Sequence, residues 1–237
     1  SQWEYLGTAG EVNGHPRNGT DGPVYALAHD AVRCVYVGGS FSLTYEGPLA
    51  NNIARYYEPG GSSPWIALGG GLNGPVRALA ATGSQNDYVY AGGTFTASGG
   101  TPMSRVARFQ YVHSGSQWEA VGAGLADDVI DLAFDYTTGA VYVVIDAEDP
   151  TQRWDGSAWS AVAGVPYGGG RGPRALAVDP EGNVYAGGYG SNGAALYVRR
   201  PGATGFALVG YESLVNMSAQ WIEDLALDGS GRVYAAT

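Results

Sequence analysis

Three histidines and one cysteine are the most reactive side chains of this 237-residue sequence. Imidazole and thiolate are ligands for copper and zinc. The histidines at positions 15, 29 and 113 show no metal-ligand spacing such as H-x-H. His29 and Cys34 lie on either side of a short predicted turn, which could bring them together. The sequence favours a structural role for both, a turn histidine and a buried thiol, over a metal site.

Acidic side chains gather in residues 127–149 and could bind calcium or form a pair of catalytic carboxylates. They surround two predicted strands: Asp127, Asp128, Asp131, Asp146, Glu148 and Asp149. No D-x-D-x-D-G calcium loop is present, and Asp131 and Asp135 should alternate with apolar positions along a strand. We therefore expect a solvated acidic rim, with calcium and a carboxylate pair as alternatives.

Arginine recurs on the predicted third strand of each copy, at Arg55, Arg108, Arg153 and, by the same pattern, Arg199. A residue that recurs in every copy usually serves the scaffold, here by stacking on a tryptophan or pairing with a carboxylate. An arginine that recognises a substrate should instead break the pattern. From these residues we predict no catalytic, cofactor-binding or metal-binding position.

The composition excludes several classes of partner. The formal net charge is −10, and the 12 basic residues are all arginine. An acidic chain without basic clusters is unsuited to nucleic acid or to an anionic membrane surface. No run of roughly 20 apolar residues is present, so we expect no membrane insertion. A single cysteine cannot form an internal disulfide.

The strands that must position these side chains are predicted from short patterns that repeat along the sequence. Four short patterns recur in a fixed order: a small apolar run such as "VRALAA", a run such as "CVYVGG", a third strand such as "NIARYY", and an aromatic run such as "WIALG". The leucines of the first pattern, at positions 27, 79, 132, 176 and 225, recur at intervals of about 50 residues. Four short strands at this period are typical of propeller blades.

The small residues and the turns fit that interpretation. "DPEG" (179–182) and "DGSG" (228–231) are hairpin turns in which Asp bonds the local backbone and Gly adopts positive φ. Small residues suit strands near a crowded axis. The repeated Gly-Gly allows a sharp exit and a close backbone approach between neighbouring blades.

The order of the patterns resembles kelch and galactose-oxidase-like propellers. The stretch "NNIARYY…SSPWIALGGGLNGPVRAL" (51–79) is most similar to repeats of bacterial surface proteins and of the fungal cortical polarity-marker (bud-site) family. The resemblance implies an all-β propeller of four-stranded antiparallel blades in a single domain, 1–237. About five blades are represented, at 23–69, 75–122, 128–163, 172–210 and 221–237, the last completed by residues 2–7.

For function, we predict a non-enzymatic extracellular or cell-surface module that acts as a structural or protein-interaction unit. The alternatives are a carbohydrate-binding propeller, with a loop aromatic such as Tyr45 at the sugar site, and a galactose-oxidase-like or glycan-active enzyme. No cofactor is expected, with calcium as the alternative noted above. Partners would be a protein, a second copy of the chain or a glycan.

The ends of the sequence raise a further expectation. The fifth copy lacks a third strand, so either the natural protein continues past Thr237 or a partner supplies the missing strand at an unpaired blade edge. The chain would then be a segment of a larger propeller or part of an assembly.

Overall fold

The computed structural model describes most of the chain: residues 11–12, 15–16, 19–30, 34–44, 49–57, 65–83, 88–110, 115–148, 150–165, 172–190, 193–209 and 221–237. These residues form strands and turns without a helix. Within these ranges nothing has the helical length and hydropathy needed to cross a membrane. Two compact units, 1–126 and 127–237, make up the chain, and each is described by itself.

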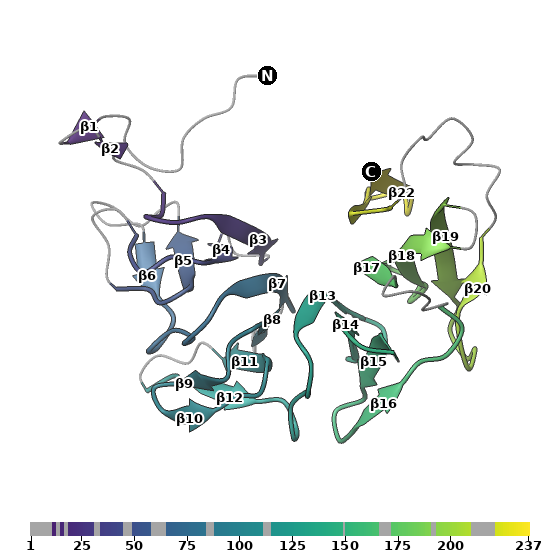
Figure 1. Ribbon diagram of the computed structural model, residues 1–237, viewed down its shortest axis with the longest axis horizontal. Coiled ribbons are helices and arrows are strands. Elements are labelled where there is room, and N and C mark those ends of the chain that lie inside the picture. The colour runs from purple at the N-terminus through teal and green to yellow at the C-terminus, as the bar shows by residue number, and fades with distance from the viewer. Residues whose placement is uncertain are drawn as a thin grey trace. The chain divides into compact units, whose positions relative to one another are not determined.

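Unit 1 contains two four-stranded antiparallel sheets (Figure 1). Blade 1 has the order β3 (Val24–His29), β4 (Cys34–Gly39), β5 (Ile53–Tyr57), β6 (Trp65–Ala67). Blade 2 has the order β7 (Val76–Ala81), β8 (Tyr88–Gly93), β11 (Val106–Gln110), β12 (Trp118–Ala120). Two small hairpins complete the unit: β1 (Glu11–Val12) with β2 (His15–Pro16), and β9 (Ala97–Ser98) with β10 (Thr101–Pro102).

Unit 2 contains two more four-stranded sheets and one two-stranded sheet. Blade 3 has the order β13 (Val129–Phe134), β14 (Val141–Ile145), β15 (Thr151–Trp154), β16 (Trp159–Ala161). Blade 4 has the order β17 (Pro173–Val178), β18 (Val184–Gly190), β19 (Gly193–Arg199), β20 (Ala207–Leu208). Repeat 5 consists of β21 (Asp224–Leu227) and β22 (Val233–Ala236). The predicted four-stranded antiparallel sheets are confirmed; residues 2–7 lie outside the described residues.

Every blade begins with a β-bulge in its first strand. The register with the second strand shifts by one residue near the start of β3, β7, β13 and β17. The bulged residues are Tyr25, Arg77, Ile130 and Arg174. A bulge bends the strand and turns the extra side chain away from the ladder, so one variable side chain is displayed at the same end of each blade.

Aspartates close the hairpins between first and second strands, as the "DPEG" and "DGSG" turns predict. The carboxylate of Asp179 accepts hydrogen bonds from the backbone N–H groups of Glu181 and Asn183 and from the hydroxyl of Tyr185 at 3.2 Å. Gly182 adopts a φ of 82°. The same Asp–Tyr hydrogen bond joins two other pairs, Asp30 with Tyr36 and Asp228 with Tyr234. These aspartates therefore belong to the scaffold.

The two glycines that end the second strands have different roles. A Cβ on Gly38 would lie 2.6 Å from the Val76 side chain of the next blade, so the first glycine makes room for a neighbour. A Cβ on Gly39 would lie 2.1 Å from the carbonyl oxygen of Pro23, in its own blade. The predicted close approach between blades therefore applies to the first glycine, and it involves side chains instead of backbone.

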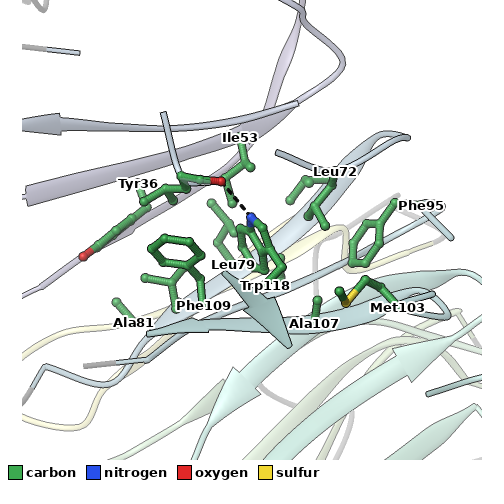
Figure 2. Packing of buried hydrophobic residues seen from close by; sticks show 14 of the residues in the cluster. Tyr36, Ile53, Leu72, Leu79, Ala81, Phe95, Met103, Ala107, Phe109 and Trp118 are labelled. Atoms are coloured by element: carbon green, nitrogen blue, oxygen red, sulfur yellow. Dashed lines mark hydrogen bonds between the residues drawn. The ribbon is translucent and has the colours of Figure 1, made fainter. Parts of the chain in front are cut away.

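Neighbouring blades pack through their first strands, with β3 beside β7 in unit 1 and β17 beside both β13 and β21 in unit 2. In unit 1 the buried core includes Leu79 and Trp118 of blade 2 together with Tyr36 and Ile53 of blade 1 (Figure 2). The indole Nε1 of Trp118 donates a hydrogen bond to the Leu68 carbonyl oxygen at 2.9 Å. Burial and this bond together connect the outer strand of blade 2 to the residue that follows the outer strand of blade 1.

Candidate interaction surface

Residues that are the same in every copy of the repeat belong to the scaffold. Residues that differ between the copies are the candidates for function. Trp221 stands four residues before the repeat leucine, where the other copies have Pro23, Pro75, Asp128 and Gly172. Tyr189 follows the Gly-Gly of β18, where the other blades have a small or acidic residue. Both aromatic residues therefore break the repeat: Tyr189 lies near the end of β18, which pairs with the bulged start of β17, and Trp221 precedes β21.

Four side chains of unit 2, Arg174, Tyr189, Trp221 and Glu223, form what we call the Trp221 cluster. The Arg174 guanidinium carbon lies 4.6 Å from the centroid of a Trp221 ring. The Tyr189 and Trp221 rings are 5.3 Å apart and inclined by 45°. Arg174 also pairs with Glu223 at 3.2 Å, and both of these side chains are about half exposed. The cluster is thus a braced, partly exposed surface.

The local fold explains why these four side chains meet. Arg174 is the bulged residue of β17, so its side chain leaves the ladder there. Glu223 occupies the same repeat position in repeat 5. The Ile222 N–H donates to the Gly188 carbonyl oxygen at 3.3 Å, which places the neighbouring Trp221 next to Tyr189 at the end of β18. A guanidinium over an indole contributes about 0.5–1 kcal/mol at an exposed site.

Asp131 of β13 makes a contact between blades 3 and 4. Its Oδ2 accepts the Leu176 N–H of β17 at 2.6 Å, and its Oδ1 accepts the Leu132 N–H at 2.8 Å. Burial raises the pKa of Asp131 to about 7; the two backbone N–H groups oppose this rise and the charge of Asp224 adds to it. Asp131 is therefore a bridging residue between β13 and β17, and the prediction that it forms part of a solvated rim is wrong.

Among the other acidic residues, Asp135 also differs from the predicted rim, whereas Asp146 and Glu148 are exposed. Asp135 is buried, and its carboxylate accepts hydrogen bonds from Thr137 and Thr138. Burial alone would raise the pKa of Asp135, but these hydrogen bonds outweigh it and lower the pKa. In the part of the chain that is described, no group of three or more His, Cys, Asp and Glu side chains is placed to hold a metal ion. Asp149 lies outside the described residues.

His29 and Cys34 do not form a site together. His29 is opposite Val35 in the β3–β4 ladder, so it shares the face of Val35, and Cys34 points to the other face. Cys34 is buried in the core of unit 1, whereas His29 is exposed. The hairpin brings the two backbones together and separates the side chains. His113 and Tyr45 lie outside the described residues, as does the side chain of His15.

The recurring arginines contact tyrosines. Arg108 lies over the Tyr88 ring at 4.6 Å and pairs with Glu119 at 3.0 Å, so the predicted carboxylate partner is present and the aromatic partner is not a tryptophan. Arg153 lies 6.0 Å from the Tyr142 ring centroid. These contacts are scaffold contacts within one blade.

The prediction that Arg199 occupies the same position is wrong by one residue. Val198 pairs with Tyr185, as Arg108 pairs with Tyr90 in blade 2. Arg199 instead donates a hydrogen bond to the Tyr142 hydroxyl of blade 3 at 2.9 Å. It therefore joins two blades, which the sequence pattern did not indicate.

The long loop of blade 2 forms a second surface feature. Asn73 fixes this loop, because its Oδ1 accepts the N–H groups of Thr96 and Ala97. A shallow pocket of about 290 Å³ lies near the outer strand. It is lined by Thr101, Gln110, Gly115, Ser116, Gln117, Trp118 and Glu119. Its polar lining includes no buried charged group aimed inward, so we assign it no chemistry.

Comparison with known proteins identifies the fold. The extracellular domain of the one-component system BT4673 from B. thetaiotaomicron superimposes with a TM-score of 0.59, at 16% identity over 92% of this chain and 27% of that one. YCF48 bound to a D1 peptide gives 0.53, at 13% identity over 91% of this chain and 60% of that one. A chain of the nidogen/laminin complex gives 0.51, at 15% identity over 75% of this chain and 63% of that one.

The fold is a β-propeller. Its four-stranded antiparallel sheets are the blades, and about five blades are represented. The chain spans from about a quarter to somewhat under two thirds of the length of these three structures. No protein-family model matches the chain, and no curated protein does.

Sequence reasoning missed the Trp221 cluster. The signal was present in the sequence, because aligning the copies on their leucines places Trp221 where the other copies carry proline, glycine or aspartate. A search for recurring residues finds the scaffold, whereas the functional candidates are the departures from the recurrence.

Proposed function

We propose that this chain is a non-enzymatic propeller module of an extracellular or cell-surface protein, and that it binds another protein through the Trp221 cluster. The observation that carries the proposal is the cluster itself: a Trp, a Tyr and an Arg, braced by Glu223, at positions that break the repeat. Trp, Tyr and Arg are the residues that most often dominate the binding energy of protein interfaces.

The chemistry of the remaining polar residues supports binding over catalysis. The hairpin aspartates bond their own turns, and Asp131 bridges two strands. Cys34 is buried. The Trp221 cluster is thus a partly exposed surface of aromatic and charged groups and not a set of groups arranged for proton transfer.

The comparisons supply further support at the level of the fold. YCF48 has a D1 peptide bound, and the nidogen/laminin structure is a protein complex. The BT4673 chain is an extracellular domain. These properties belong to those proteins, and they support the proposal only in that chains with this fold include protein-binding ones. The kelch-like and polarity-marker resemblance and the extracellular location are part of the same proposal.

A peptide selection tests the proposed surface. Peptides from a random displayed library would be selected on the purified chain, and their affinities measured by fluorescence polarisation. Trp221→Ala and Arg174→Ala should each weaken the dominant binders by about 30-fold or more, the size expected for a central interface residue.

Arg77→Ala is the matched control, because Arg77 is the bulged, exposed arginine of blade 2, in unit 1, and is not a member of the Trp221 cluster. It should leave these affinities unchanged. Selected peptides that bind Trp221→Ala and Arg174→Ala as tightly as wild type would refute the proposal.

Two other functions remain as outcomes of separate tests. Sugar stacking needs an open aromatic face, and in the cluster Arg174 covers one face of Trp221 while Tyr189 packs against the ring at an angle. A glycan array that shows binding lost in Trp221→Ala would nevertheless establish a lectin. Stoichiometric copper in the purified protein, together with oxidation of an alcohol or sugar substrate, would establish an oxidase.

A further inference from the structure

We propose that the junction between blades 3 and 4 binds a small dianionic oxyanion, of the sulfate or phosphate class, between Arg153 and Arg199 at the hydroxyl of Tyr142. All three residues belong to unit 2. The site shares no residue with the Trp221 cluster, and the proposal does not depend on the proposed function.

Arg199 departs from the repeat at a position that is otherwise aromatic. Blades 1, 2 and 3 carry Tyr56, Phe109 and Trp154 there, and each of these residues pairs with a valine of the second strand. Arg199 pairs with Val184 in the same way. It therefore replaces an aromatic residue of the scaffold, as expected of an arginine that recognises a ligand.

Arg153 and Arg199 extend into the same junction from opposite blades. Tyr142 and Tyr197 are both buried in the core cluster that joins blades 3 and 4. Arg153 is opposite Tyr142 in the β14–β15 ladder, so the two share a face of the sheet. Arg199 follows Tyr197 by two residues on β19 and shares its face. The guanidinium carbons of Arg153 and Arg199 lie 6.0 and 5.7 Å from the centroid of the Tyr142 ring.

These two positive charges have no carboxylate in contact with them. In blade 2 the equivalent Arg108 pairs with Glu119 at 3.0 Å. Blade 3 has Ser160 in place of that glutamate, opposite Arg153. Neither Arg153 nor Arg199 forms an ion pair with any residue that the structure describes. The pair of guanidinium groups is thus available to an anion from solution.

Asp155 is an acidic residue whose charge interacts with Arg153, but it is engaged elsewhere. Its pKa is lowered to about 2, first by hydrogen bonds from Ala158 and Ser157 and least by the charge of Arg153. The carboxylate is exposed and accepts these hydrogen bonds within its own turn. Solvent screens an exposed charge of this kind, so Asp155 does not neutralise the arginine pair.

The Tyr142 hydroxyl adds a third donor. In blades 1 and 4 and in repeat 5, the equivalent tyrosine donates its proton to the aspartate of the hairpin turn. In blade 3 that aspartate, Asp135, accepts instead from the hydroxyls of Thr137 and Thr138. Tyr142 is 1% exposed and accepts a hydrogen bond from Arg199 at 2.9 Å, while its own proton has no acceptor among the described residues. A buried hydroxyl requires an acceptor, which a bound anion supplies.

The chemistry of the three groups defines the ligand. A guanidinium has N–H donors and no acceptor, and its planar fork matches two oxygens of an oxyanion. Arg199 uses one nitrogen for Tyr142, and its others remain for a ligand. A dianion neutralises two guanidinium charges, whereas a carboxylate would leave one unbalanced. Both arginines are partly exposed, so the ion reaches the site from solvent.

Isothermal titration calorimetry with sodium sulfate tests the site, near neutral pH and with the ionic strength held constant by sodium chloride. One sulfate should bind per chain with a Kd on the order of 1 mM, the strength expected of a few charge-assisted hydrogen bonds that are partly open to solvent. A binding measurement is needed because sulfate also stabilises folded proteins by its exclusion from their surface.

Two variants remove one arginine each. Arg199→Phe introduces the residue of blade 2, where Phe109 is buried in the junction with blade 1, so the variant should fold. It should weaken sulfate binding by about tenfold or more, the effect of losing hydrogen bonds to a charged group. Arg153→Gln, at a partly exposed position, should weaken binding to the same extent.

Arg200→Gln is the matched control. It removes the same charge from the neighbouring residue, which is exposed and whose charge acts on Tyr185 instead. Its Kd for sulfate should equal that of wild type.

Methyl phosphate separates two sources of the ligand. A monoester that binds as tightly as inorganic phosphate would show that the anion is a group on a larger molecule. Binding of the inorganic ion alone would show that a free ion is held in the junction. Both results support the proposal, because both place a dianion at the arginine pair.

Wild type that binds neither sulfate nor phosphate at concentrations up to about 20 mM would overturn the proposal. Undiminished sulfate binding in Arg199→Phe and Arg153→Gln would do the same. An equal loss of binding in Arg200→Gln would show that only net charge matters, and acetate that binds as tightly as sulfate would contradict the assignment of a dianion.

Discussion

Replacing Gly38 by alanine should destabilise unit 1, because the added Cβ would lie 2.6 Å from the Val76 Cγ1 and 3.1 Å from the Leu79 Cδ1. Both atoms belong to branched side chains of the next blade, which are 0% and 9% exposed and have little space to move. Overpacking of this kind typically costs about 1–3 kcal/mol. The lower conformational entropy of unfolded alanine offsets about 0.4–1 kcal/mol of that.

A double-mutant cycle with Val76→Ala isolates the proposed contact. Val76→Ala alone should cost roughly 2 kcal/mol, from two buried methyl groups and the cavity that they leave. With Val76 shortened, the new methyl of Gly38→Ala occupies part of the vacated space. The double variant should therefore lose roughly 1–2 kcal/mol less than the sum of the single variants.

The assay is equilibrium urea unfolding followed by tryptophan fluorescence, since Trp65 and Trp118 are both buried in unit 1. The free energy of unfolding is extrapolated to water for wild type, both single variants and the double variant. Strict additivity across the cycle would refute the account of the first glycine as the space that receives the next blade.

Three further predictions concern polar contacts. The pKa of Asp131 is about 7 in the folded chain and about 4 when unfolded, so the folded state holds more protons between these values and the free energy of unfolding falls as pH rises from about 4 to 7. Asp131→Asn should remove this slope in pH-dependent urea unfolding, and an unchanged slope would show that another group causes it. Trp118→Phe should cost about 0.5–1.5 kcal/mol, measured in the same way, because it removes the indole hydrogen bond between the two blades while the Leu68 carbonyl oxygen keeps the Gly71 N–H as a donor; no loss would mean that the bond is dispensable. Asp179→Ala should lower stability by about 1–3 kcal/mol because it removes the acceptor that closes the β17–β18 hairpin, whereas the exposed Glu181→Ala should not; equal effects would contradict that role.

The sequence predicted the blade scaffold because the scaffold is what recurs. Leucine spacing, the Gly-Gly stop and the Asp-containing turns each reflect a local or nearest-neighbour constraint, and the structure confirms the four-stranded antiparallel sheets. The error at Arg199 has a physical origin: Arg199 is the last residue of β19 and Arg200 follows it, and only the strand register, in which Val198 pairs with Tyr185, shows that neither occupies the repeated position.

Contacts between blades were harder to predict. An aspartate on an alternating strand looks like a solvent-facing residue unless the neighbouring strand is placed, and Asp131 accepts a hydrogen bond from Leu176, which is 45 residues away in the sequence. The Trp221 cluster was missed for the same reason, because Arg174 and Glu223 are 49 residues apart and meet only when repeat 5 packs on blade 4. The differences between the copies can be seen in the sequence. The sequence does not show which of the differing residues lie close together in the folded chain.

Hydrogen–deuterium exchange with a selected peptide tests the central claim most directly, that the repeat-breaking side chains of unit 2 form a protein-binding surface. Exchange of the free chain would be compared with that of the chain saturated with peptide. The account predicts slower exchange at residues 172–176, 188–190 and 221–224, around the cluster, and unchanged exchange at the bulge of blade 2, residues 75–78. Protection confined to other blades, with residues 221–224 unaffected, would contradict it.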